Sequence, residues 1–338
     1  MLEGVLPDGF TPTLIAVLAL AIAFDYINGF HDTANAIATS VSTRALKPGW
    51  AIAMSAVANF TGALIGTEVA KTVGSGLIDT NVESQTVIAA ALVGAITWNL
   101  ITWRLGIPSS SSHALIGGLL GAALISAGVG SWQMGGVVGK VLVPLVASPI
   151  IGFVVGLLLM GLIFNVFRRA HPGRLNASFR RLQVISAAFM AFSHGSNDAQ
   201  KTMGIMTLAL FTAGIQTTFE PPLWVILTAA TALSLGTAAG GWRIIHTMGT
   251  KVVKLDPVHG FAAETTAASI IIGASHFGMP VSTTHVISSA IMGVGSSDRM
   301  RTVRWGVARS IVTAWILTIP ASGLTAAVAY LILNPFLG

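Results

Sequence analysis

The sequence predicts an all-α polytopic membrane protein with two inverted-topology repeats, whose broken or re-entrant helices meet near the bilayer midplane. Three observations support this fold class. Of the 338 residues, 53% are hydrophobic and only 9% are charged, whereas a soluble domain carries roughly 25% charged residues. Apolar stretches of about 20 residues, long enough to cross the hydrocarbon as helices, recur along the chain. Two polar motifs each occur twice, about half the chain length apart.

The apolar runs are continuous rather than alternating, which is typical of membrane helices and not of the strands of a β-barrel. The first run, "LIAVLALAIAF", could be mistaken for a signal peptide. Its front end holds Glu3 and Asp8 without Lys or Arg, and no A-x-A-like cleavage site precedes the first polar motif. We therefore expect it to stay in the protein as a crossing helix.

The formal net charge of +6 comes from basic residues in short loops between apolar segments. Orientation in the membrane explains such residues, so we expect no nucleic-acid partner. The chain contains no cysteine, which excludes disulfides, thiolate metal sites and cysteine nucleophiles. It also has no H-E-x-x-H, P-loop or G-x-S-x-G motif, so we predict that it is not an enzyme.

The first polar motif, "GFHDTANA" at residues 29–36, is matched by "GSNDAQKT" at residues 195–202. The second, "IPSSSSHALIGGLLG" at residues 107–121, is matched by "MPVSTTHVISSAIMG" at residues 279–293. The offsets are 166 and 172 residues. We therefore divide the chain into a first repeat (1–167), a basic cytoplasmic linker (168–181) and a second repeat (182–338).

Loop charges indicate how the repeats are oriented. If the N-terminus is outside and each half crosses five times, 15 of the 18 Lys and Arg residues fall inside, as the positive-inside rule favours. Lys71 and Lys140 then fall outside, and Lys201 lies at membrane depth. Asp79, Glu83 and Glu220 also fall outside. An odd number of crossings makes the halves antiparallel and puts both termini outside. Whether the Ser/Thr motifs are re-entrant hairpins stays open.

Inverted repeats with matched, interrupted helices are the layout of secondary transporters, whose substrate site lies near the midplane. In "PSSSSH" and "PVSTTH", a proline interrupts the helix and small hydroxyl residues precede a fresh apolar helix. Such residues cap helix N-termini, whose free N–H groups and partial positive charge attract anions. We predict one anion site between the two copies. The alternative is that these hydroxyls only satisfy backbone carbonyls or allow close helix packing.

The other motif places carboxylates at bilayer depth, where unpaired charge costs several kcal/mol and a functional role is the default hypothesis. Asp32 and Asp198 are related by the repeat, and Asn35 and Asn197 add amide oxygens, which suit a small hard cation or a proton. A buried network that only pins broken helices is the alternative. Lys201 replaces the asparagine of the first copy, and either neutralises an aspartate or lends positive charge to the anion.

Other residues are weaker candidates. Asp25 lies about two turns before Asp32. Glu264 begins a later helix and is either a proton carrier or an interface residue. Histidines flank the motifs and could relay protons near neutral pH, although each alone is more often a satisfied hydrogen-bonding residue. They are His31, His113, His194 and His285.

Together, "GFHDTANAIATSVSTRAL", "FSHGSNDAQKTMGI", "PSSSSH" and "PVSTTH" resemble the duplicated signatures of the inorganic phosphate transporter (PiT) family, and the resemblance covers nearly the whole chain. It implies cation-coupled uptake of inorganic phosphate by a bacterial low-affinity type of transporter in the plasma (inner) membrane. The resemblance implies that the coupling cation would lie near Asp32, Asn35, Asn197 and Asp198. It also implies that phosphate would be held by six hydroxyl residues, Ser110, Ser111, Ser112, Ser282, Thr283 and Thr284. If sodium couples transport, Asp32 and Asp198 are its metal ligands.

The chain departs from the animal members at His31 and Lys201, where they carry asparagine, and it lacks their long central loop. These departures leave H+ and Na+ both open as the coupling ion, with no other cofactor expected. Transport of a metal–phosphate complex and homo-oligomeric assembly also stay open. A sulfate permease of the same family is the main alternative function. An anion channel and a membrane enzyme acting on a phosphorylated lipid are more distant ones.

Overall fold

A computed structural model describes residues 9–79, 84–297 and 300–337 of the chain. Three acidic residues named above lie outside this part, namely Glu3, Asp8 and Glu83, and so does Arg299, one of the 15 basic residues expected inside. The described residues are almost entirely helical, as the fold class predicts. A single β-bridge between Ile78 and Trp132 is the only extended pairing within them.

The first half of the chain forms an ordered series of helices. These are α1 (Pro12–Ser42), α2 (Pro48–Ala63), α3 (Glu68–Ser75), α4 (Gln85–Leu105), α5 (Ser111–Ala127), η1 (Val129–Ser131), α6 (Met134–Gly136), η2 (Val137–Leu142) and α7 (Val143–Phe167). The second half repeats the pattern. It contains α8 (Pro172–Thr212), α9 (Leu223–Ala239), α10 (Trp242–His246), η3 (Thr247–Lys251), α11 (Pro257–His276), α12 (Thr283–Ser296), η4 (Met300–Thr302) and α13 (Trp305–Leu337).

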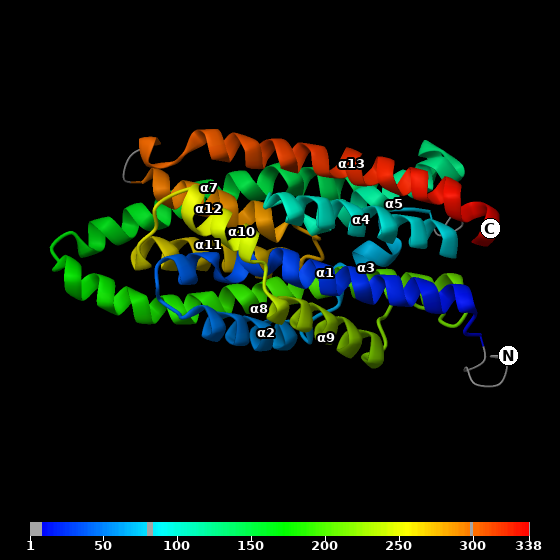
Figure 1. The fold of residues 1–338 in the computed structure, drawn as a ribbon, viewed down its shortest axis with the longest axis horizontal. Coiled ribbons are helices and arrows are strands. Elements are labelled where there is room, and N and C mark those ends of the chain that lie inside the picture. The colour runs from blue at the N-terminus through cyan, green and yellow to red at the C-terminus, as the bar shows by residue number, and fades with distance from the viewer. Residues whose placement is uncertain (1–8, 80–83, 298–299, 338) are drawn as a thin grey trace.

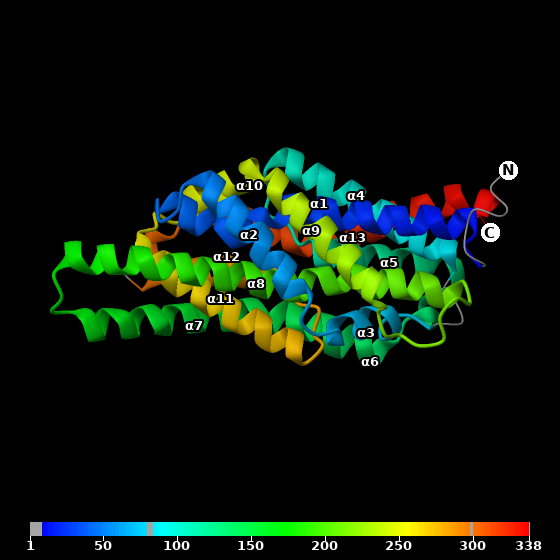
Figure 2. The same ribbon diagram turned by 90° about the horizontal axis from the view of Figure 1, so that it is seen from below.

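The two halves run in opposite directions through the molecule. In Figure 1, α1 and α7 run from right to left, whereas their counterparts α8 and α13 run from left to right. Helix α1 begins and α13 ends at the same end of the molecule. At the opposite end α7 and α8 extend beyond the other helices (Figure 2). Residues 172–181 of the basic segment are the first turns of α8. The prediction of two inverted-topology repeats is confirmed.

The break in the second helix is duplicated as well. Helix α2 bends by 72° into α3, and α9 bends by 62° into α10 and η3. In the described part of the chain, four helices are long and apolar enough to cross a membrane, or up to six if each bent pair is one span. Several apolar helices together with two broken ones agree with a multi-pass membrane protein.

The Ser/Thr motifs form the turns of two helical hairpins, α4–α5 and α11–α12. The first hairpin turns after Gly106 (φ +67°) and the second at Gly278 (φ +64°), left-handed conformations that favour glycine. Ser109 and Ser282 in the turns are buried. The first turn contacts His31, which lies in the middle of α1. The first turn therefore lies inside the bundle, so α4 and α5 form a re-entrant hairpin. The expected count of five crossings in that half is wrong, because the hairpin enters and leaves on the same side.

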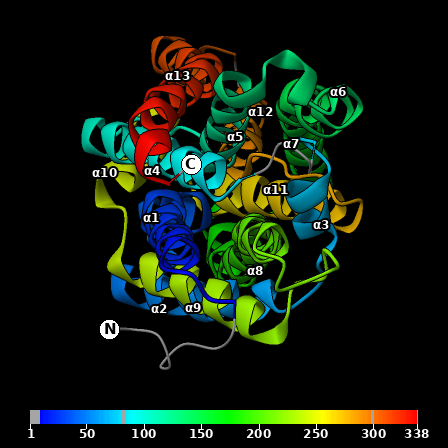
Figure 3. The same cartoon turned by 90° about the vertical axis from the view of Figure 1, so that its right-hand side faces the viewer.

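The halves exchange packing partners across the molecule. Helix α1 packs on α9 and α8 packs on α2, while hairpin α4–α5 packs on α13 and hairpin α11–α12 packs on α7. Figure 3, viewed along the bundle, shows α2 and α9 together on one side of α1 and α8. The repeated motif glycines permit this contact. A Cβ on Gly29 would lie 2.2 Å from the carbonyl oxygen of Leu233, and one on Gly195 would lie 2.2 Å from that of Asn59.

Candidate functional site

The two hairpin turns meet in the centre of the bundle. Ser112 Oγ donates to the carbonyl oxygen of Val281 at 3.4 Å, which joins the first turn to the second. Asn35 on α1 reaches the second turn, where its Nδ2 donates to Thr284 Oγ1 at 2.9 Å and to Thr283 Oγ1 at 3.3 Å. All of these side chains are buried. The structure thus places the hydroxyl residues of both copies together.

Two helix N-termini point into this region. Ser110 is the N-cap of α5 and accepts from the His113 N–H at 3.1 Å. Ser282 is the N-cap of α12 and accepts from the His285 N–H at 3.2 Å. The capped N–H is the third of each helix, so helix geometry leaves the first two N–H groups without intrahelical acceptors. Each turn therefore offers backbone donors and a partial positive charge.

The Asp32 carboxylate lies beside the first hairpin. His31 Nδ1 lies 2.6 Å from Asp32 Oδ1, and His31 Nε2 lies 3.0 Å from Thr102 Oγ1 on α4. Ser109 Oγ in the turn donates to Thr102 Oγ1 at 2.8 Å. The imidazole therefore connects the carboxylate of α1 to the hairpin. Thr102 and Ser109 were not predicted from the sequence, because only tertiary contact brings them to the motif.

The Asp198 carboxylate lies beside the second hairpin. Its Oδ1 forms an ion pair with Lys201, and its Oδ2 lies 3.1 Å from His194 Nε2 and accepts from Thr283 Oγ1 at 3.2 Å. Lys201 also donates to Ser112 Oγ at 2.5 Å and to the Val281 carbonyl at 3.1 Å. The lysine thus contacts an aspartate of one motif and both hairpin turns. Its position is compatible with both roles that the sequence left open, which are to neutralise an aspartate and to lend positive charge to the anion.

Asn197 contacts the end of α11 and the start of the second turn with its amide nitrogen. Its Nδ2 donates to Ser275 Oγ at 2.8 Å and to the Met279 carbonyl at 3.2 Å. Its Oδ1 is buried without a hydrogen-bond partner. That oxygen is therefore available as a ligand, although the two asparagines make different contacts. Asn35 instead uses its nitrogen on the second hairpin.

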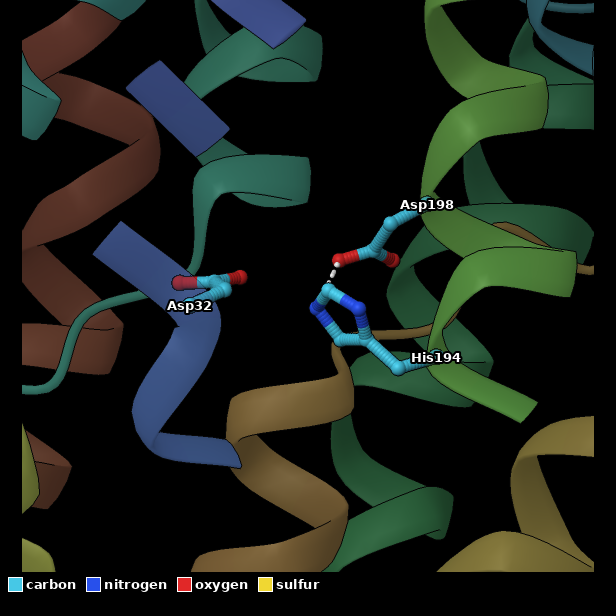
Figure 4. Close-up of side chains that lie close together, drawn as sticks. All are labelled: Asp32, His194 and Asp198. Atoms are coloured by element: carbon cyan, nitrogen blue, oxygen red, sulfur yellow. Dashed lines mark ion pairs between the residues drawn. The ribbon is translucent and has the colours of Figure 1, made fainter. Parts of the chain in front are cut away.

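Two aspartates and a histidine form the centre of the candidate cation site. Asp32, His194 and Asp198 each offer a ligand atom within 4.8 Å of the others. Figure 4 shows Asp32 on α1 facing His194 and Asp198 on α8. Carboxylate oxygens fit Na+ or a proton, whereas an imidazole is a weaker ligand for a hard alkali cation. His194 lies four residues before Asp198, and this helical spacing places both side chains on one face of α8. The spacing is a sequence signal that could have identified His194 as a candidate ligand of the same site.

The weaker candidates fall in three further places. Glu264 lies where α1, α8 and α11 meet, accepting from Ser186 Oγ at 2.5 Å, from Gln183 Nε2 at 3.2 Å and from Thr39. Asp25 is buried on α1. The repeat-related His113 and His285 contact each other with ring centroids 4.6 Å apart. His285 also stacks on Trp315 at 4.0 Å. These contacts make the histidine pair part of the junction between the hairpins.

Two inverted repeats whose broken helices gather polar side chains inside an apolar bundle define a membrane transport protein. This chain belongs to the Phosphate transporter family, whose sequence profile matches residues 28–174 and 168–326. The family resemblance predicted from the motifs is confirmed. Its relatives are named as transporters, in agreement with the prediction of a non-enzymatic protein.

Two bacterial relatives are similar over nearly their whole length. The probable low-affinity inorganic phosphate transporter of Bacillus subtilis (strain 168) is 50% identical over 95% of this chain and 97% of its own. That of Rhizobium meliloti (strain 1021) is 50% identical over 94% of this chain and 96% of its own. A solved structure, "The sodium-dependent phosphate transporter", has a TM-score of 0.90 and 24% identity, covering 97% of this chain and 100% of that chain. Its fold is therefore the same.

Proposed function

We propose that this chain is a secondary transporter that imports inorganic phosphate across a bacterial plasma (inner) membrane, driven by H+ or Na+, by alternating access. The observation that carries the proposal is the meeting of two hairpin turns, each with a helix N-terminus, beside two repeat-related carboxylates. One half of this arrangement suits an anion and the other suits a cation. Relatives at 50% identity are named as phosphate transporters, which supports the choice of substrate.

Phosphate is proposed to bind between the turns. Hydroxyls and backbone N–H groups donate to its oxygens without fixed charge, so that the anion can be released as well as bound. Lys201, which already contacts Ser112, adds one positive charge at the same place. The proposed phosphate ligands are Ser110, Ser111, Ser112, Ser282, Thr283 and Thr284.

The coupling cation is proposed to bind at Asp32 and Asp198, with Asn35 and Asn197 as neighbouring amides. Phosphate carries negative charge into a region of low dielectric, where charge unaccompanied by a counter-ion is costly. A bound cation offsets that charge, so the fully loaded site crosses more easily than the half-loaded one. The similar solved structure is named sodium-dependent, which favours Na+. The histidines beside both aspartates favour a proton.

The domain division into repeats 1–167 and 182–338 with the segment 168–181 between them belongs to this proposal. Alternating access would expose the junction between the hairpins first to one side and then to the other. The antiparallel halves make the two openings structurally equivalent. We further propose that both termini face outward, which places the basic ends of α7 and α8 inside.

The decisive experiment is uptake of labelled phosphate into proteoliposomes with Na+ and H+ gradients imposed separately. A carrier predicts saturable uptake that accumulates phosphate against its gradient when one of the two ion gradients is present. An anion channel would give unsaturated flux without accumulation. Release of an altered product would identify an enzyme. Repeating the assay with and without divalent cations tests whether a metal–phosphate complex is carried.

Sulfate is the second candidate substrate. Phosphate near neutral pH still carries a proton and needs an acceptor, whereas sulfate needs only donors. Asp198 Oδ2, which already accepts from Thr283, supplies such an acceptor beside the second turn. We therefore expect unlabelled sulfate to compete poorly with labelled phosphate. Equal inhibition by the two anions at the same concentration would reject phosphate as the preferred substrate.

A further inference from the structure

A second cluster of positive charge lies outside the junction of the hairpins. A pocket of about 430 Å³ opens where the end of α4 meets α10 and η3. Three of its lining residues are permanently cationic, and none of the lining residues is acidic. They are Arg104, Leu105, Gly106, Trp242, Arg243, His246, Thr247 and Lys251. Convergence of cations without an acidic partner is unfavourable unless an anion or solvent compensates it.

The arginine at the centre of this pocket is held in position. Arg243 Nη1 donates to the Arg104 carbonyl at 2.6 Å, and its guanidinium carbon lies 5.6 Å from the centroid of the Trp103 ring. Thr247 Oγ1 donates to the Gly106 carbonyl at 3.0 Å and ties η3 to the same turn. Because these contacts use one side of the guanidinium, its other N–H groups remain available for a ligand with several oxygens.

The fold itself does not require these cations, as the repeat shows. Gly278 is the counterpart of Gly106 in the other hairpin, and both have positive φ. A Cβ on Gly106 would meet the Arg243 carbonyl and Thr247, while one on Gly278 would meet the Glu68 carbonyl and Thr72. Arg243 therefore corresponds to Glu68.

At that opposite end the positive charge is compensated within the protein. Lys71 pairs with Glu68 at 3.2 Å and with Glu220 at 2.8 Å. The two repeat-related regions therefore differ in charge. The one around Gly278 has acidic partners for its lysine, whereas the charged residues that line the pocket at Gly106 are all basic. Orientation in the membrane explains excess cations at the inner end, but it does not require them to converge on one pocket around a fixed arginine.

We propose that the α4–α10–η3 pocket binds a phosphate group from outside the transport site. Trp242 is 49% exposed and Leu105 is 65% exposed beside the cations, and apolar surface next to a basic pocket between helices is a combination that binds anionic phospholipids. The same cations would also hold inorganic phosphate entering or leaving on that side. In both cases the cations would bind the anionic oxygens of a phosphate group, which is supplied either by an anionic phospholipid or by free inorganic phosphate.

Occupancy of this pocket would act on the first hairpin. The Gly106 carbonyl that accepts from Thr247 belongs to the turn that leads to Ser110, four residues later. The segment from α10 to η3 also packs on α1, where a Cβ on Gly241 would lie 2.2 Å from the Phe30 carbonyl. The pocket thus borders both the hairpin turn and the helix that carries Asp32.

The test uses the purified full chain and three variants, Arg104→Gln, Lys251→Gln and, as a matched control, Arg174→Gln. Arg174 is an exposed arginine near the start of α8, outside the pocket. Binding is measured in two arms by native mass spectrometry and by thermal-shift titration. One arm uses phosphatidylglycerol against phosphatidylcholine, and the other uses inorganic phosphate on the lipid-stripped protein.

We expect affinity for the ligand to fall about fivefold for each pocket cation removed and to be unchanged in the control. Loss confined to the phosphatidylglycerol arm identifies a lipid headgroup, and loss confined to the phosphate arm identifies the free ion. Phosphate binding at the hairpin turns is separated by Ser111→Ala, which leaves the pocket cations in place. Equal affinities of both pocket variants and the control in both arms would overturn the proposal, whatever the uptake assay shows.

Discussion

The buried charges at the hairpin junction are arranged in pairs. Asp32 contacts His31, and Asp198 contacts Lys201 and His194, all with less than 3% of their surface exposed. A charge in a low-dielectric interior is retained only with partners, because its desolvation costs several kcal/mol. The partners differ between the two copies. The two aspartates therefore have different environments in spite of their repeat relationship, and each is expected to respond differently to substitution.

Asp32→Asn should abolish gradient-driven phosphate accumulation. The amide keeps the shape of the side chain but removes the charge that would hold the coupling cation. The measurement is uptake into proteoliposomes under the effective gradient. Glu220→Gln is the matched control, since Glu220 is an exposed acidic residue at one end of the molecule. Undiminished accumulation by the Asp32 variant would remove it from the coupling site.

Ser111→Ala should weaken phosphate binding by about 1 kcal/mol, the net value of a neutral hydrogen bond. This corresponds to about a fivefold rise in the half-saturating phosphate concentration. Ser111 Oγ makes only a long hydrogen bond, with His31 Nδ1 at 3.5 Å, so its hydroxyl contributes little to the stability of the fold. Ser310→Ala on the exposed face of α13 serves as control. Identical half-saturation in the two variants would place the anion elsewhere.

Lys201→Met should destabilise the folded protein by about 3–5 kcal/mol, because it leaves the Asp198 carboxylate buried without its cation. Adding Asp198→Asn removes the unpaired charge and should recover part of the loss. Thermal unfolding in detergent compares the two variants with the original chain. If the double variant is no more stable than the single one, the ion pair is not the source of the effect.

At the scale of helices, the exchange of partners between halves depends on close backbone contact. Gly195→Ala would place a methyl group 2.2 Å from the Asn59 carbonyl at the contact of α8 with α2. Overpacking of this kind costs about 1–3 kcal/mol. We expect the melting temperature in detergent to fall and phosphate uptake to fall with it, because α8 carries Asp198.

The control for this substitution is Gly161→Ala on α7. A Cβ there has no atom within 4 Å, and alanine favours a helix over glycine by roughly 0.5–1 kcal/mol. The stability of this variant should be unchanged or slightly raised. If the Gly195 variant is as stable as the Gly161 variant, α2 and α8 can move apart to accept the methyl group without loss of stability, which would contradict the prediction.

At the scale of the whole molecule, the antiparallel halves fix which ends share a side of the membrane. Because the chain has no cysteine, single cysteines can be placed without prior removal of others. Thr218→Cys lies in the connection between α8 and α9, and Ser178→Cys lies near the start of α8, both exposed. On the proposed orientation, an impermeant maleimide labels the first in intact cells and the second only after the membrane is opened. The reverse pattern would invert the topology.

Much of this architecture could be predicted from the sequence. Composition requires helices in lipid, since each backbone group must bond within its own segment. The duplicated motifs indicate two copies, and loop charges give their opposite directions. The Pro–Ser/Thr–His order indicates helix starts, which the structure has at Ser111 and Thr283. These features depend on the local sequence and on the lipid environment, so they can be predicted without knowing which segments contact each other.

The tertiary structure alone decided which groups meet. Lys201 reaches Ser112 across 89 residues, and Asn35 reaches Thr284 across 249. The partner roles of Thr102 and Ser109, and the place of His194 beside Asp198 and Asp32, also follow from packing. The same holds for the basic pocket between α4 and η3. Sequence order does not encode such contacts directly, because they arise when helices of opposite halves exchange partners and bring distant side chains within hydrogen-bond reach.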